Sequence, residues 1–146
     1  MSKLTQYGHT FQIKALAVLI TDRDFLQQIA DIVSPDYFDN DAGKWVMRKT
    51  LSYFNEYKTV PTMEVFKVEV GKINQELQSV AVKDLLKQAY KASESTDLNY
   101  VKDTFLDFCK NQTLKGALIK SVDLLELGDY DDIRNLIDGA LKAGTE

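Results

Sequence analysis

Proline, glycine, cysteine and histidine are all scarce in this sequence. Two prolines and seven glycines occur among 146 residues, whereas β-sandwiches and β-barrels need many turn residues. We therefore expect helices. The single cysteine, Cys109, has no partner for an internal disulfide, and the amino terminus does not read as a signal peptide. Both features are typical of a reducing compartment, so we predict a cytoplasmic location.

An excess of positive charge is missing as well. The 18 basic and 22 acidic side chains give a net charge of −4 and a pI near 5.0. An autonomous nucleic-acid-binding module usually has a basic stripe, so we expect weak or no direct DNA binding. Long apolar runs are also missing. The longest, residues 15–20, is too short to cross a bilayer, and we predict no membrane partner.

The sequence also lacks the motifs of common catalytic sites. Gly43 and Lys44 are followed by Trp45, and the spacing of a phosphate-binding loop occurs nowhere. His9 is the only histidine, and Cys109 has no histidine partner for nucleophilic chemistry, so we interpret it as a small buried side chain. We predict no catalytic, cofactor-binding or metal-binding residues in this chain.

An acidic cluster around Asp39 is interpreted as a helix start rather than a calcium site. An EF-hand loop beginning at Asp39 would need glycine and glutamate where Lys44 and Thr50 stand. We expect Asp41 to cap one helix and Asp129 to cap the last helix.

Apolar residues at helical spacing are abundant, and hydrophobic residues make up 45% of the chain. Their periodicity, with the start and stop signals beside them, predicts a nearly continuous series of helices. Tyr57 is expected among the buried residues. The predicted helices cover residues 11–21, 22–33, 42–58, about 62–73, 76–92, 97–127 and 130–142.

Residues 66–70 are the ambiguous segment, because they alternate as a strand does. No second strand pattern exists to pair with them, and an unpaired strand would leave its backbone groups unsatisfied. Met63, Phe66 and Val70 also share a helical stripe, after a proline and a threonine at positions 61–62 that form a helix start signal. We predict a helix.

The predicted fold class is all-α, with a compact helical head at residues 1–95 followed by a long antiparallel helical hairpin at residues 96–146. The first hairpin helix would be about 45 Å long and would end at Gly128. Two helices alone have little interior to bury their apolar stripes, so a partner surface is one way to cover them. The other is packing against the head of the same chain, and the pattern favours neither. The predicted oligomer interface consists of Leu114, Leu118, Val122, Leu125, Ile133, Leu136, Ile137 and Leu141.

Several segments together resemble a known family. The apolar run at residues 15–20, the later run at residues 25–33 and the sequence Asp-Tyr-Phe at 36–38 resemble the amino-terminal domain of DnaB-like replicative helicases. Residues 36–70 resemble most closely the replicative helicases of T-even-type tailed bacteriophages, and residues 130–141 resemble the second helix of the family's hairpin. Before the fourth helix, Val-Pro-Thr replaces the family's proline or glycine followed by aspartate.

The resemblance implies an assembly domain without catalysis. In this family the amino-terminal domains pair through their hairpins, form a collar on the hexameric ring, and bind primase and sometimes a loader protein. ATP and magnesium bind a separate RecA-like ATPase domain, and this chain stops about where the linker to that domain would begin. We expect self-association (a dimer, a trimer of dimers or a hexamer) and a parent ATP-dependent DNA helicase acting in DNA replication in the cytoplasm of an infected bacterial cell.

A second hypothesis is a stand-alone helical DNA-binding or adaptor protein of a phage replication or packaging apparatus. Its support is the basic group Lys44, Arg48 and Lys49, which lies beside Trp45. Aromatic side chains beside basic ones can stack on nucleic-acid bases. At helical spacing, however, an aromatic residue belongs to the core more often than to a binding surface.

Overall fold

The computed structural model describes residues 4–145, and all regular structure in this part of the chain is helical. The predicted all-α class is therefore confirmed for these residues, including the ambiguous segment, which forms α4. Short 3-10 helices lie at Leu4–Tyr7 and Pro35–Tyr37. The α-helices are α1 (His9–Thr21), α2 (Arg23–Ile29), α3 (Asp41–Tyr57), α4 (Met63–Val70), α5 (Glu76–Ala92), α6 (Leu98–Glu126) and α7 (Tyr130–Lys142).

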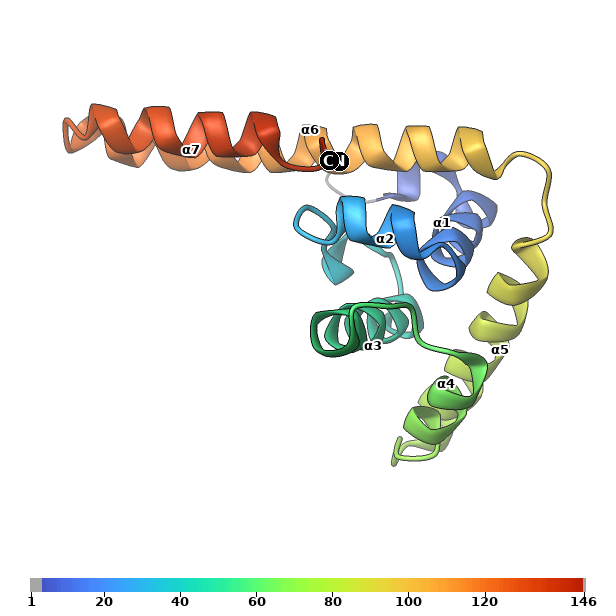
Figure 1. Ribbon diagram of the computed structural model, residues 1–146. Helices are drawn as coiled ribbons and strands as arrows, with labels where there is room; N and C mark the ends of the chain where they lie inside the picture. The colour runs from blue at the N-terminus through green and yellow to red at the C-terminus, as the bar shows by residue number, and fades with distance from the viewer. Residues whose placement is uncertain (1–3, 146) are drawn as a thin grey trace.

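Helix α1 is the centre of the head. Every side chain from Ala15 to Ile20 is buried, and the helix contacts α2, α3, α5 and α6 (Figure 1). The largest fully buried side chains of the core are Phe38, Phe66 and Phe105, which come from widely separated parts of the chain. An all-round apolar helix of this kind is stable only when other elements surround it, which explains its place.

Polar side chains begin the helices where the sequence signals predict. The Phe25 N–H donates to Asp22 Oδ1 at 3.0 Å at the start of α2, and the Val65 N–H donates to Thr62 Oγ1 at 3.2 Å at the start of α4. Each bond satisfies one of the backbone donors that a helix leaves free in its first turn.

The predicted cap of α3 is wrong by one residue. The Gly43 N–H donates to Asn40 Oδ1 at 2.8 Å, whereas Asp41 is already the first helical residue. Asn40 and Asp41 are both good capping residues, and the extended backbone of Asn40 decides between them. Asp129 precedes α7 as predicted, but among the described residues its side chain accepts no capping bond.

Two other local expectations are corrected. Helix α2 ends at Ile29 rather than at Val33, although Ile32 and Val33 are still buried in the turn that follows. Tyr57 is 57% exposed rather than buried. It is the last residue of α3, and the next residue, Lys58, adopts a left-handed backbone (φ 62°) that turns the chain away.

Helix α6 belongs to the head at one end and leaves it at the other. Val101, Phe105, Phe108 and Cys109 in its first half are buried against the head. The second half extends beyond the head, and α7 runs back along it (Figure 1). We call residues 111–142 the arm. Gly128 makes the reversal possible, because its φ of 70° suits glycine far better than other residues.

Candidate interaction surface

The arm carries a row of half-exposed apolar side chains on α6. Leu118, Val122 and Leu125 are 54%, 56% and 59% exposed. Their spacing of four and three residues places them on one side of the helix. Large apolar side chains that remain this exposed in a row are characteristic of surfaces that bind a partner.

This row lies beside the contact between α6 and α7. Ala117 is buried, and Ser121 and Leu124 are partly buried, so these residues mark the side of α6 that α7 covers. Each residue of an α-helix is rotated by about 100° from the one before it, so Leu118 and Val122 both lie to the same side of the surface that α7 covers. They form a flank of the arm rather than its interior.

Helix α7 contributes to the same flank. Its partly buried residues Ile133, Leu136 and Ile137 face α6, and Tyr130 and Leu141 are 69% and 57% exposed. The two helices run in opposite directions. Side chains that are rotated by the same angle away from the shared contact therefore lie on the same side of the helix pair. We define the arm face as Leu118, Val122 and Leu125 of α6 together with Tyr130, Ile137 and Leu141 of α7.

The predicted interface residues divide into two sets. Leu114, Ile133, Leu136 and Ile137 are partly buried, and Leu118, Val122, Leu125 and Leu141 are exposed. Within residues 4–145, the head does not cover the exposed set.

Sequence reasoning missed other exposed apolar residues on the arm. Ile119, Leu127 and Tyr130 are 62%, 78% and 69% exposed. Leu127 and Tyr130 flank Gly128 at the arm's end, and their closeness to that turn is the signal that could have identified them. Ile119 follows Leu118 directly and lies off the predicted stripe, so periodicity gave no reason to select it.

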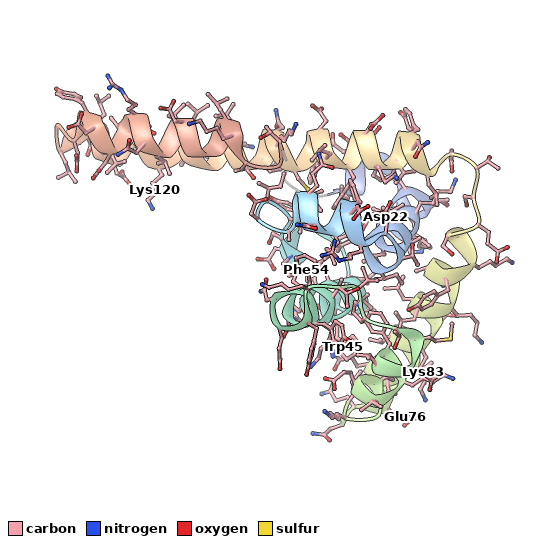
Figure 2. All side chains as sticks on the ribbon, viewed as in Figure 1. Asp22, Trp45, Phe54, Glu76, Lys83 and Lys120 are labelled. Atoms are coloured by element: carbon pink, nitrogen blue, oxygen red, sulfur yellow. The ribbon has the colours of Figure 1, made fainter. Side chains whose placement is uncertain are left out.

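The basic group beside Trp45 is arranged differently from a nucleic-acid site. Trp45 is only 8% exposed and lies inside the head (Figure 2). Lys49 Nζ lies 5.6 Å from the centre of the Trp45 ring and 3.2 Å from Glu69 Oε1. The tryptophan is covered and Lys49 is ion-paired, whereas Arg48 of the same basic group is exposed.

The candidate catalytic side chains are not assembled into a site. His9 is exposed as the first residue of α1, whereas Cys109 is buried, and burial raises the pKa of its thiol far above the usual value. Within residues 4–145, histidine, cysteine, aspartate and glutamate form no group suited to a metal ion. None of the described helices is both long and apolar enough to span a membrane.

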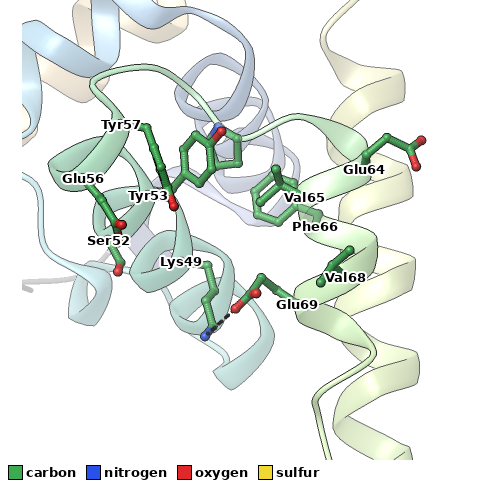
Figure 3. Close-up of a pocket in the computed structure, with 11 residues that line it drawn as sticks. Lys49, Ser52, Tyr53, Glu56, Tyr57, Glu64, Val65, Phe66, Val68 and Glu69 are labelled. Carbon is green, nitrogen blue, oxygen red and sulfur yellow. Dashed lines mark hydrogen bonds and ion pairs between the residues drawn. The ribbon is translucent and has the colours of Figure 1, made fainter.

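The head also contains an open groove between α3 and α4 with a volume of about 530 Å³ (Figure 3). Its walls include Tyr53 and Tyr57 of α3 and Val65 and Val68 of α4. It lies on the head and is separate from the arm face.

Comparisons of the chain with protein-family models, with curated proteins and with solved structures give no significant match.

Proposed function

We propose that this chain is an assembly domain that binds further copies of itself through the arm face. The observation that carries the proposal is the row of half-exposed apolar side chains that α6 and α7 share and that the head leaves uncovered. A twofold-symmetric pair of arms would place each row against its own copy, the commonest arrangement in soluble oligomers.

The apolar side chains of the arm face can contribute several kcal/mol to such a contact. Full burial of a leucine or valine side chain is worth about 1.5–3 kcal/mol, so a half-exposed one can contribute roughly half of that. Leu118, Val122, Leu125 and Leu141 all have at least half of their surface free, and each would be used twice in a symmetric pair. The sum of about 6–12 kcal/mol falls within the range of about 4–15 kcal/mol for the cost of association.

The more specific role that we propose is that of the amino-terminal domain of a DnaB-like replicative helicase. Support comes from the segments of sequence quoted above and from the arm, which supplies a pair of antiparallel helices where that family uses its hairpin to form a collar. Primase and a loader protein are the proposed further partners. Unwinding and ATP hydrolysis would belong to an ATPase domain outside this sequence.

The competing function, a DNA-binding or adaptor protein, has less support. Its support was the basic group Lys44, Arg48 and Lys49 beside Trp45. Trp45 is buried and Lys49 is paired with Glu69, which leaves Arg48 as the exposed member of the group. The net charge of −4 also opposes binding to a polyanion.

Sedimentation velocity over a range of concentrations tests self-association. We expect the wild-type chain to form a larger species as concentration rises, and Leu118→Asp to remain monomeric, because the new carboxylate would be buried without a partner. An unpaired buried charge costs several kcal/mol, which corresponds to a loss in affinity of more than about a hundredfold.

Lys120→Asp is the matched control. Lys120 projects from the arm into solvent, and its position in the helix places it on the flank opposite to Leu118 (Figure 2). Lys120→Asp introduces a carboxylate two residues away from position 118 and should leave the association constant within about threefold of the wild-type value. Equal losses in both variants, or a wild type that is monomeric at every concentration, would contradict the proposal.

A further inference from the structure

Two charged side chains, Arg134 and Asp138, lie on the same side of α7 as the arm face. Arg134 follows Tyr130 by four residues, and Asp138 precedes Leu141 by three. Such spacings place side chains on one side of a helix. Both charged side chains are exposed, and within residues 4–145 neither has a hydrogen-bond or ion-pair partner. The apolar side chains of the arm face are therefore accompanied by one cation and one anion that the described chain leaves unpaired.

Each of these charges is level with an apolar side chain of α6. Val122 and Arg134 are each six residues from Gly128, which lies in the turn between the two helices. Leu118 and Asp138 are each ten residues from it. At about 1.5 Å per residue, these two levels are about 9 and 15 Å from the turn. Because α7 runs back along α6, each level contains one charged and one apolar side chain (Figure 1).

Two twofold arrangements can bring a pair of arm faces together, and they differ in the direction of the arms. In the first, both arms point the same way, and α7 of each copy lies on α6 of the other at the same level. Arg134 would then meet Val122 of the other copy, and Asp138 would meet Leu118. This arrangement would bury charges against apolar side chains, which is costly.

In the second arrangement the arms point in opposite directions, so that α6 lies on α6 and α7 lies on α7. A twofold axis midway between the two levels, about 12 Å from the turn, brings the Arg134 level of one copy to the Asp138 level of the other. The same axis places Leu118 against Val122 of the other copy. Opposite charges then meet in both halves of the contact, and apolar side chains meet apolar side chains.

We propose that two copies pair through the arm face with their arms antiparallel, in the register that joins Arg134 of each copy to Asp138 of the other. This inference rests on the proposed self-association and adds the direction of the arms and the residues that select it. A cation and an anion at equal distances from the middle of an apolar row are complementary to themselves, which is the property that a surface needs to bind its own copy. The axis also lies near the middle of the arm, so the end of each arm would reach the place where the other arm leaves its head.

Charge reversal tests the register by sedimentation velocity. Arg134→Asp places like charges at both symmetric contacts, and so does Asp138→Arg. Each variant alone should therefore associate at least about tenfold more weakly than the wild type. When the two variants are mixed, each chain supplies the charge that the other lacks, and every contact again joins opposite charges. We expect the mixture to form a heterodimer with an affinity within about threefold of the wild-type value.

Two substitutions on the opposite flank of the arm serve as matched controls. Lys120→Asp and Asp123→Arg make the same changes of charge at exposed positions of α6 that face away from the arm face. Each control should associate within about threefold of the wild type. A loss in the controls equal to that in Arg134→Asp and Asp138→Arg would show that net charge, rather than the proposed contact, controls association.

The distance between the heads tests the orientation without any change on the arm face. A spin label on Asp103→Cys would lie on the exposed side of α6 in the head, 17 residues or about 25 Å from the level of the proposed axis at residue 120. Cys109 is buried, so the introduced thiol is the accessible one in the described chain. Pulsed electron paramagnetic resonance should give at least about 50 Å between the two labels, whereas parallel arms would place them at the same level and within about 40 Å.

The outcomes separate this inference from the proposed function. A wild type that is monomeric at every concentration would remove both. If the wild type associates, three results would overturn the antiparallel register alone. These are equal association of Arg134→Asp and Asp138→Arg with the wild type, a mixture of the two that is as weak as each variant by itself, and head labels within about 40 Å of each other.

Discussion

At the scale of single residues, Asp22 connects two parts of the fold. One of its oxygens accepts the N–H of Phe25 at 3.0 Å and begins α2, and the other accepts from Lys102 Nζ of α6 at 3.0 Å. Burial opposes ionisation of Asp22, but the backbone bond and the lysine outweigh it and hold its pKa below the usual 3.8. The residue therefore stabilises the fold in its charged form.

Substitution of Asp22 separates these two contributions. Asp22→Ala removes the cap and should lower the free energy of unfolding by about 1–2 kcal/mol at pH 7. Asp22→Asn keeps an oxygen that can cap the helix and should cost less. Denaturant unfolding of the wild type and both variants measures the two effects, and equal losses would show that the cap contributes nothing.

The lowered pKa of Asp22 also predicts how the free energy of unfolding of these variants depends on pH. The pKa of Asp22 is lower in the folded chain than in the unfolded chain, so its ionic contribution is fully present above the unfolded pKa and is lost as pH falls through the folded pKa. The difference in unfolding free energy between the wild type and Asp22→Asn should therefore narrow as pH falls below the usual pKa of 3.8. A difference that stays constant from pH 7 to pH 3 would contradict this assignment.

At the scale of helices, two glycines of the arm have opposite roles. Gly128 has a φ of 70° and ends α6, whereas Gly116 lies inside the same helix. An added Cβ would meet no described atom within 4 Å at either position. Any effect of alanine therefore reports backbone conformation alone.

We predict effects of opposite sign at these two positions. Gly116→Ala should raise the free energy of unfolding by roughly 0.5–1 kcal/mol, because glycine costs entropy inside a helix. Gly128→Ala should lower it by about 1 kcal/mol, because alanine is strained at positive φ. Chemical denaturation at one fixed protein concentration measures both, and the same sign for the two would contradict the predicted roles.

Local signals explain which helices could be predicted closely. The ranges predicted for α5 and α7 agree with the structure, since each of these helices begins with an acidic first turn and ends beside a polar or glycine-containing segment. The error at Asn40 and Asp41 arose where two adjacent residues carry the same signal. Tyr57 was predicted to be buried because helical periodicity places it on the apolar face of α3. Periodicity does not show whether another element covers that face at the end of the helix.

The candidate surfaces could be predicted only in part, for the same reason. The apolar stripe that includes Leu118 and Val122 can be predicted from the sequence, but periodicity does not show whether the head covers it. The groove was not predicted, because Tyr57 and Val68 line it only once α3 and α4 have each packed on α5. Periodicity within one helix does not give that arrangement.

At the scale of the whole molecule, α6 joins the head and the arm in one continuous helix. Its first half is buried against α1 and α2, and its second half packs with α7. The carbonyl of Gly144, just beyond α7, accepts a hydrogen bond from Gln28 Nε2 at 3.2 Å, so the arm is attached to the head at a second point. Association through the arm face would therefore also fix how the heads are oriented.

The central claim, that the arm face binds a second copy of the chain, is tested most directly by intermolecular NMR contacts. A sample that mixes isotope-labelled and unlabelled chains reports only the contacts made between copies. We predict contacts from the methyl groups of Leu118, Val122 and Leu141 to the partner copy, with none from Val65 or Val68 in the groove. Intermolecular contacts located on the head, or none at concentrations where sedimentation detects an oligomer, would contradict the account.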